Sequence, residues 1–220
     1  MTVPATKPFA KAASAIKPDD TVPPIFPCRA GAKEPATTHG HKDAARTHED
    51  LKRLAREYPD ANIGFALENA GLCVVDIDGP EGENSLALLE LQHGAFPATR
   101  EVKTPHGRHL YFRGTLPPSV SKIGPHIDTR GRGSYVLAPG SIVNGVRYEA
   151  TNGLAPAELP EWIRELVTVE PDTKHTSAAK GDPVDGATLR EALSFLDPGE
   201  HYEGWRNIVA GIGAANCAAS

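Results

Sequence analysis

Residues 72–80, LCVVDIDGP, place two aspartates, Asp76 and Asp78, at the end of an apolar run and directly before a Gly-Pro break. The run predicts a β-strand, in which alternating side chains put Asp76 and Asp78 on one face and Val75 and Ile77 on the other. Two carboxylates so close repel each other unless a cation neutralises them or one is protonated. The pair therefore indicates a divalent-metal site, and oxygen ligands without cysteine favour Mg²⁺ or Mn²⁺.

Three classes of enzyme use such a pair: phosphatases, glycosyltransferases and nucleotide polymerases. The stretch resembles the first motif of the haloacid dehalogenase phosphatases, but that motif wants Thr or Val where this chain has Pro80. It also needs a later acidic pair, and no Asp-Asp follows Asp78. A glycosyltransferase leaves the residues downstream unexplained. The remaining alternative is that the two carboxylates are simply solvated at the end of a strand and bind no metal.

The composition is that of an ordinary globular protein, with 220 residues, 40% hydrophobic and 23% charged. No apolar stretch is long enough to span a bilayer, so we expect no membrane partner. The three cysteines, Cys28, Cys73 and Cys217, form no Cys-x-x-Cys pair, which argues against zinc and favours a reducing, intracellular setting. The net charge is −5, yet residues 100–132 hold seven basic and two acidic residues, a local charge of +5 that could attract phosphates.

Apolar periodicity predicts four helices and a larger number of short strands. Thr47 is the expected N-cap of the second helix, and Gly94 is the expected stop of the third. We expect helices within residues 7–17, 47–59, 82–94 and 158–167, and strands within 23–27, 62–67, 72–78, 100–105, 107–114, 127–131, 134–140 and 146–150.

The C-terminal quarter of the chain has a different pattern. Residues 170–185 are rich in Pro, Gly, Ser and Asp without apolar periodicity, which predicts a linker. Residues 186–220 predict two helices broken at residues 197–199. Because the pattern stops while still helical, we expect residues 186–220 to be the start of an incomplete helical domain and the chain to be the front of a longer protein.

Two downstream stretches add residues that suit the aspartate pair. TPHGRHLYFRG (104–114) carries His109 on a strand, and IDTRGRGSYVLAPGS (127–141) carries Asp128, Arg130 and Arg132. Three acids, a histidine and arginines on successive strands suit two-metal phosphoryl transfer, in which acids hold the ions and cations hold a triphosphate. Taken alone, His109 is more often an ordinary strand histidine, and Asp128 could simply pair with either arginine.

These blocks, together with IFP, GAKEP, HGHKDAARTHEDL, DANIGFAL and GVRYEA, resemble the N-terminal domain of bifunctional DNA primase-polymerases. This is the prim-pol branch of the archaeo-eukaryotic primase superfamily, found in phages and plasmids. The likeness runs from about Ile25 to Leu166. It implies an α+β (mixed α/β) catalytic domain over residues 1–169, with an antiparallel palm sheet similar to the RNA-recognition fold and an N-terminal α/β lobe. Residues 186–220 more weakly resemble the small helical domain that often follows.

The resemblance also implies roles for individual residues. Asp76, Asp78 and Asp128 match the family's metal-binding acids for two Mg²⁺ or Mn²⁺ ions. His109 matches the histidine that contacts the nucleotide triphosphate, and Arg130 and Arg132 stand where relatives commonly have basic residues for phosphate. Gly107 departs from the pattern, because many relatives have serine there, and we carry no hydroxyl contact over.

The sequence also suggests roles for five further residues. We expect Asn62 and Gly64 to fix the entry of a strand rather than to touch substrate. Lys33 and Lys42 match the family pattern and would face template or nucleotide. Tyr135 is open between stacking on a base or ribose and packing in the core.

The function implied by the resemblance is template-directed nucleotidyl transfer, as DNA primase and DNA polymerase in phage or plasmid replication. Its partners would be a single-stranded DNA template and primer, nucleoside triphosphates, and a helicase domain elsewhere in the protein. The setting would be the cytoplasm of a bacterial host. Two alternatives stay open: a non-catalytic nucleic-acid-binding module that keeps the primase fold, and a glycosyltransferase or phosphatase that uses Asp76 and Asp78.

Overall fold

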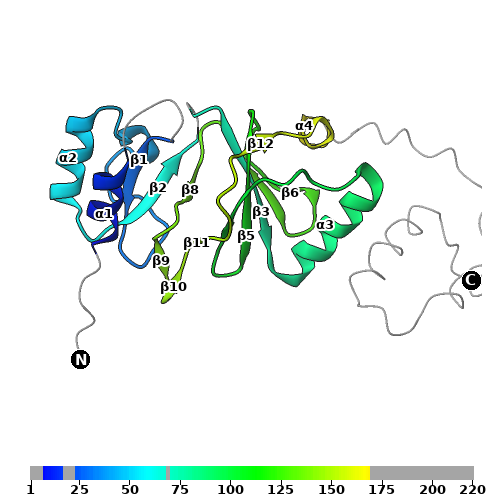
Figure 1. Ribbon diagram of the computed structural model, residues 1–220, viewed down its shortest axis with the longest axis horizontal. Coiled ribbons are helices and arrows are strands. Elements are labelled where there is room, and N and C mark those ends of the chain that lie inside the picture. The colour runs from blue at the N-terminus through cyan, green and yellow to red at the C-terminus, as the bar shows by residue number, and fades with distance from the viewer. Residues whose placement is uncertain (1–6, 17–22, 68–69, 169–220) are drawn as a thin grey trace, which may run out of the picture. The chain divides into compact units, whose positions relative to one another are not determined.

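The computed structural model describes residues 7–16, 23–67 and 70–168. The predicted linker (170–185) and helical segment (186–220) lie outside these residues. Within them, helices and mainly antiparallel sheets confirm the mixed α+β class (Figure 1). No helix in the described ranges is long and apolar enough to cross a membrane.

The larger sheet has seven strands, six of them in the order β11-β4-β5-β3-β7-β6, all antiparallel to their neighbours. The seventh, β12, pairs with β5 in parallel. The strands are β3 (Leu72–Asp78), β4 (Arg100–Lys103), β5 (Gly107–Arg113), β6 (Ser119–Gly124), β7 (Ile127–Arg130), β11 (Glu149–Ala150) and β12 (Ala157–Glu158). Strand β3, which carries the aspartate pair, is therefore interior, with β5 on one side and β7 on the other.

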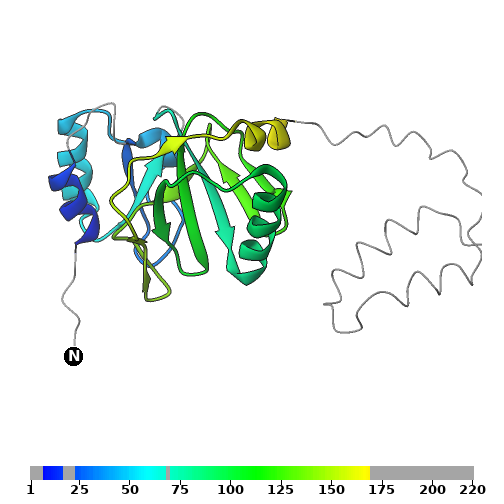
Figure 2. The ribbon, with the colours of Figure 1, turned by 45° about the vertical axis from the view of Figure 1, so that its right-hand side comes forward.

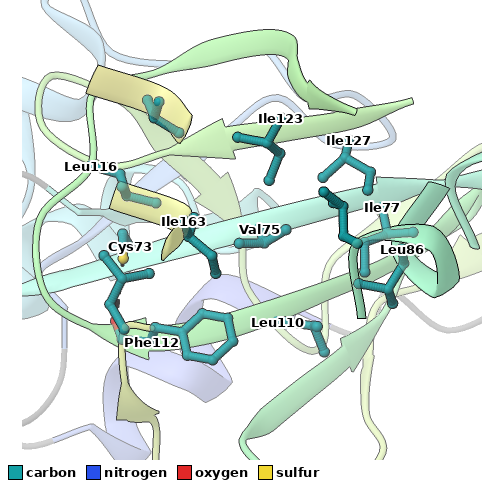
Figure 3. Packing of buried hydrophobic residues seen from close by; sticks show 13 residues of the cluster. Cys73, Val75, Ile77, Leu86, Leu110, Phe112, Leu116, Ile123, Ile127 and Ile163 are labelled. Carbon is teal, nitrogen blue, oxygen red and sulfur yellow. Dashed lines mark hydrogen bonds between the residues drawn. The ribbon is translucent and has the colours of Figure 1, made fainter. Parts of the chain in front are cut away.

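Helices α3 (Gly79–His93) and α4 (Glu161–Thr168) cover one face of this sheet. Both views show the two helices beside the sheet (Figures 1 and 2). Val75 and Ile77 of β3 pack there in one buried cluster with Leu86 of α3 and Ile163 of α4 (Figure 3). Burying such aliphatic side chains stabilises the fold by roughly 1.5–3 kcal/mol each. The predicted alternation along β3 is confirmed, because it leaves Asp76 on the opposite face.

A smaller antiparallel sheet holds β1 (Ile25–Cys28), β2 (Asn62–Ala66) and β8 (Tyr135–Leu137), with β2 in the middle. Helices α1 (Pro8–Ala15) and α2 (His48–Glu57) pack on it through a second core that includes Phe9, Leu54 and Ile63. The predicted N-cap of α2 is confirmed: Thr47 forms a reciprocal capping box with Asp50.

Asn62 and Gly64 fix strand β2, as expected. The buried Asn62 side chain donates to the carbonyl oxygens of Ala32 and Ile142, at 2.9 and 2.7 Å, and accepts from the Ile142 amide at 2.8 Å. A Cβ atom on Gly64 would lie 2.4 Å from the Phe26 ring, so only glycine fits beneath that ring. These contacts join β2 to Phe26 of β1, to the loop at Ala32 and to Ile142 further along the chain.

The structure differs from the predicted elements in several places. No pattern in the sequence indicated that β2 and β3, which are consecutive along the chain, belong to different sheets. Helix α3 begins at Gly79 rather than at Gly82, with Pro80 in its first turn, where proline's missing amide costs nothing. The segment expected as one strand at 146–150 is split into β10 (Val146–Arg147) and β11. The elements not predicted are β6, β9 (Ile142–Val143), β12 and a short 3₁₀ helix, η1 (Gly40–Asp43).

Candidate active site

The larger sheet brings three predicted site residues into one row. Asp76 on β3 lies opposite His109 on β5 and opposite Asp128 on β7. Residues directly opposite in antiparallel strands share a face, so these three side chains are neighbours on the face away from α3. Asp78 lies two residues further along β3, opposite Gly107 at the end of the strand.

Asp76 and His109 form a nearly buried pair. The Nε2 atom of His109 lies 3.3 Å from Oδ1 of Asp76, and the two side chains are 6% and 17% exposed. Burial raises the pKa of Asp76, but the hydrogen bond and charge of His109, with the charges of Arg130 and Lys33, outweigh it and hold the pKa below its ordinary value. Asp76 is therefore an anion with three basic side chains already acting on it.

The other two acids have different surroundings. Asp128 accepts from Nη2 of Arg130 at 2.7 Å and from the Ser121 amide at 3.0 Å. Asp78 stands at the N-cap of α3, where its side chain makes no capping hydrogen bond. Burial and then the negative charges of Asp76 and Asp128 raise the pKa of Asp78, against the opposing effects of Lys33 and His106. This carboxylate would gain most from an added cation.

A pocket of about 430 Å³ opens beside Asp76, a volume within the range of small-molecule sites. Its wall includes the basic side chains of Lys33 and Arg130 and the aromatic rings of Tyr135 and Tyr148. Its lining consists of Lys33, His41, Asp76, His109, Arg130, Gly133, Ser134, Tyr135, Val136, Leu137 and Tyr148. Because these residues come from both sheets and from the loops between their strands, the pocket depends on the tertiary fold.

The pocket includes some of the predicted site residues and leaves out others. Asp76, His109 and Arg130 line it, whereas Asp78 and Asp128 stand next to Asp76 without lining it. Arg132 is exposed and lies outside the lining. Lys33 and Tyr135, for which the sequence left the role open, both line it, and Lys42 is exposed.

His41 and Tyr148 are among the pocket residues that the sequence did not assign to the nucleotide site. The Tyr148 side chain is nearly buried, with its ring 5.9 Å from that of His109. Burial, and then the charges of Asp76 and Asp78, raise the pKa of Tyr148 to about 12. In the sequence, Tyr148 is only an aromatic residue within the block GVRYEA. That block predicted a strand and gave no indication of a binding site.

Carboxylate oxygens, such as those of Asp76, Asp78 and Asp128, are the ligands that a hard divalent ion prefers. The three side chains are not arranged around a common point. They offer three sets of carboxylate oxygens without a thiol, and their mutual repulsion raises the pKa of Asp78. Across the described residues, no group of three or more His, Cys, Asp or Glu side chains is arranged to hold a metal ion. Instead, the carboxylate of Asp76 contacts His109, and the carboxylate of Asp128 forms an ion pair with Arg130.

Two glycines are required by close approaches of the backbone. A Cβ atom on Gly107 would lie 1.9 Å from the carbonyl oxygen of Ile77, so a serine has no room here. A Cβ atom on Gly131 would lie 2.1 Å from the carbonyl oxygen of Leu116. Both contacts join the ends of site strands to neighbouring backbone, which explains these glycines without a ligand.

The predicted basic surface is reduced by ion pairs. Arg108 binds Glu83 through two contacts of 2.8 Å and Glu101 at 2.7 Å, while Arg113 pairs with Glu158 at 2.7 Å. Arg108 thus connects α3, β4 and β5. Together with the Arg130–Asp128 pair, these contacts show that part of the local charge of residues 100–132 is balanced within the protein.

Comparison with known proteins agrees with the resemblance found in the sequence. No curated protein matches the chain. The family model described as bifunctional DNA primase/polymerase, N-terminal, matches residues 21–162, which is more than half of the 220 residues and includes every residue that lines the pocket. The chain therefore belongs to the family of bifunctional DNA primase/polymerase N-terminal domains, the prim-pols.

Proposed function

We propose that this chain is a template-directed nucleotidyltransferase that synthesises and extends DNA primers. Membership of the prim-pol family supports primase/polymerase chemistry in general. The observation that carries the specific proposal is the placement of Asp76, which lies opposite both His109 and Asp128 and beside a pocket with cationic walls. That arrangement suits a reaction in which acids hold metal ions and cations hold phosphates.

In this proposal Asp76, Asp78 and Asp128 would hold two Mg²⁺ or Mn²⁺ ions. Such ions, when bound, lower the pKa of a primer 3′-hydroxyl and balance the charge of the leaving pyrophosphate. His109, Arg130 and Lys33 line the pocket and would bind the triphosphate, and the planar guanidinium of Arg130 suits two phosphate oxygens at once. Asp76 contacts His109 at 3.3 Å and would hold its imidazole in place in the pocket wall.

Tyr135 supports a place for the nucleobase or ribose. The Tyr135 and Phe26 rings pack edge to face, with their centroids 5.1 Å apart and their planes at 86°. The Tyr135 hydroxyl donates to the Lys33 carbonyl oxygen at 3.2 Å. His41 lies roughly parallel to it, 6.2 Å away between centroids. Both residues line the pocket, and an aromatic face held in this way can stack on any base.

The same proposal includes the wider setting expected from the resemblance. The partners would be a single-stranded DNA template, a primer, nucleoside triphosphates and a helicase. The setting would be replication of a phage or plasmid in the cytoplasm of a bacterial host. The glycosyltransferase and phosphatase alternatives gain no support from the family match, which concerns primase/polymerase domains.

The test is a nucleotide-incorporation assay on primed and unprimed single-stranded templates, with either deoxyribonucleotides or ribonucleotides and with Mg²⁺ or Mn²⁺. We expect template-dependent products from the wild-type chain. Asp76→Asn should reduce them by roughly a hundredfold or more because it removes a metal ligand. Asp60→Asn, at an exposed position outside the site, is the control and should retain activity.

Three other outcomes would reject the proposal. DNA binding without incorporation under every condition would favour the non-catalytic module. Turnover of a nucleotide sugar or of a phosphomonoester, independent of template, would favour the glycosyltransferase or phosphatase. Full activity of Asp76→Asn would show that the aspartate pair is not the metal site.

A further inference from the structure

Both oxygens of the Asp128 carboxylate are engaged within the protein. Oδ2 accepts from Nη2 of Arg130 at 2.7 Å, and Oδ1 accepts from the Ser121 amide at 3.0 Å. The Asp128 side chain is only 14% exposed, so water contributes little to balancing its charge. A divalent ion that used Oδ2 would meet the guanidinium of Arg130 at contact distance, and the two positive charges would repel each other.

Arg130 is the counter-charge for more than one acid. It lies two residues after Asp128 on β7, opposite Val74, and therefore on the same face as Asp76 and Asp128. Its charge acts on Asp76 as well, helping to hold the pKa of that carboxyl below its ordinary value. Its side chain also lines the pocket, where a triphosphate would lie under the proposed function. Arg130 thus borders both the acid row and the nucleotide pocket.

We propose that Arg130 is a specificity-determining residue that makes this site bind divalent ions together with a nucleotide in preference to the ions alone. Without a nucleotide, the guanidinium neutralises Asp128 and keeps the ion from that carboxylate. With a nucleotide present, the triphosphate offers Arg130 a second anionic partner of matching planar geometry, and Asp128 becomes available. This inference rests on the proposed function, because it assumes that the pocket receives a nucleoside triphosphate.

The proposal requires a coupling between two ligands. If the nucleotide raises the affinity for the ion by a given factor, the ion must raise the affinity for the nucleotide by the same factor. Removing the guanidinium should change both affinities in opposite directions: the ion alone binds more tightly, and the nucleotide binds more weakly. A residue that served only as a phosphate ligand would weaken nucleotide binding and leave the coupling unchanged.

The experiment measures Mn²⁺ binding by electron paramagnetic resonance, which reports free Mn²⁺ and does not depend on activity. The probe nucleotide is a deoxyadenosine triphosphate whose α,β-bridging oxygen is replaced by methylene, so that no transfer occurs. We expect the analogue to tighten Mn²⁺ binding to the wild type by about tenfold or more. In Arg130→Gln, Mn²⁺ alone should bind about tenfold more tightly than to the wild type, and the analogue should add less than about threefold.

Three further variants serve as controls. Arg113→Gln removes the same charge at a 53% exposed position that pairs with Glu158, so it should behave as the wild type. Arg130→Lys keeps the charge beside Asp128, so Mn²⁺ alone should still bind weakly even if Arg130→Gln fails to fold. A separate variant, Lys33→Gln, removes another pocket charge that acts on Asp76 and Asp78 but makes no close ion pair with Asp128. It should tighten Mn²⁺ binding less than Arg130→Gln does.

Distinct results would reject this inference and the proposed function. Equal coupling in the wild type and Arg130→Gln, with Mn²⁺ bound by both, would overturn the role of Arg130 and leave the proposed function standing. Tight Mn²⁺ binding to the wild type without the analogue would do the same. No Mn²⁺ binding to any of the proteins, with or without the analogue, would overturn both.

Discussion

Asp76 and His109 face each other across β3 and β5, with Nε2 of the histidine 3.3 Å from Oδ1 of the aspartate. The contact connects an acid of the proposed metal site with a histidine of the proposed triphosphate site. Because both side chains are nearly buried, each one holds the other in place. A change at either residue should therefore affect nucleotide use more than it affects binding of DNA.

We predict that His109→Ala lowers nucleotide incorporation by roughly 10- to 150-fold, the usual effect of losing a hydrogen bond to a charged group. The loss should be mainly an increase in KM for the nucleotide, measured by steady-state incorporation on a primed template. Binding to single-stranded DNA, measured by fluorescence anisotropy, should change little. If DNA binding collapses while the KM for the nucleotide stays the same, the role given to His109 is wrong.

Arg130 and Arg132, which sequence reasoning treated alike, should differ. Arg130 lines the pocket, whereas Arg132 is exposed and lies outside it. Arg130→Ala should weaken nucleotide binding by about tenfold or more, because it removes a charged phosphate partner. Arg132→Ala should change it by less than about threefold, as surface substitutions usually do. Titration of each variant with a fluorescent nucleotide gives the two affinities, and equal losses would contradict the geometry of the pocket.

The local pattern of β3 was predictable because strand alternation depends only on neighbouring residues. Val75 and Ile77 had to share one face, and Asp76 and Asp78 the other. The N-cap of α2 at Thr47 was predictable for the same reason, since a cap interacts within one turn of its helix. Such features need no knowledge of the rest of the chain.

The arrangement of the strands was less predictable, because it depends on distant parts of the chain. The register that puts Asp76 opposite both His109 and Asp128 joins segments more than 30 residues apart. Strand β6 was missed because its residues do not alternate clearly, and Val120 is 75% exposed. Tyr148 enters the pocket from a segment at the edge of the sheet, a position that no local pattern indicates.

Gly107 should tolerate no side chain. A Cβ atom there would lie 1.9 Å from the Ile77 carbonyl oxygen, so Gly107→Ala must push apart the ends of β3 and β5. We expect the free energy of unfolding to fall by about 1–3 kcal/mol, the range for overpacked sites. Urea unfolding measures the change. Gly153→Ala is the matched control, because its Cβ atom would meet nothing within 4 Å, and a loss of stability as large there would contradict the steric explanation.

The capping box of α2 should make the stability of the fold depend on pH. The Thr47 hydroxyl donates to Oδ2 of Asp50 at 2.8 Å, and this hydrogen bond lowers the pKa of Asp50 below its ordinary 3.8. A carboxyl whose pKa is lower in the folded state stabilises the fold above about pH 3.8, and the stabilisation is lost as pH falls through the folded-state value. Asp50→Ala should therefore cost about 1 kcal/mol at pH 7 and less as the pH approaches 3.

The control for this prediction is Glu49→Ala in the same turn of α2. Glu49 is 80% exposed and pairs with Lys52 at 3.2 Å, so its removal should cost only a few tenths of a kcal/mol. Urea unfolding at several pH values compares the two variants. A cost for Asp50→Ala that stays constant down to pH 3 would show that its carboxylate charge is not what stabilises the helix.

Tyr135 gives the last prediction, which concerns the base or ribose of the nucleotide. If its ring stacks on the ligand, Tyr135→Ala should raise the KM for nucleotides by roughly 5- to 150-fold, the usual effect of removing a stacking ring. Tyr135→Phe keeps the ring and loses only the hydrogen bond to the Lys33 carbonyl oxygen, so it should stay within about threefold of the wild type.

The competing explanation is that Tyr135 only packs against Phe26, since their rings meet edge to face at 5.1 Å. Tyr135→Leu distinguishes the two, because leucine keeps an apolar contact with Phe26 but has no planar face for a base. Stacking predicts that the leucine variant unfolds at a urea concentration near that of the phenylalanine variant and yet shows the raised KM of the alanine variant. Packing alone predicts that KM follows stability through the series, because a ring that serves only the core affects the nucleotide through the fold. A leucine variant with wild-type KM would therefore place Tyr135 in the core and remove it from the nucleotide site.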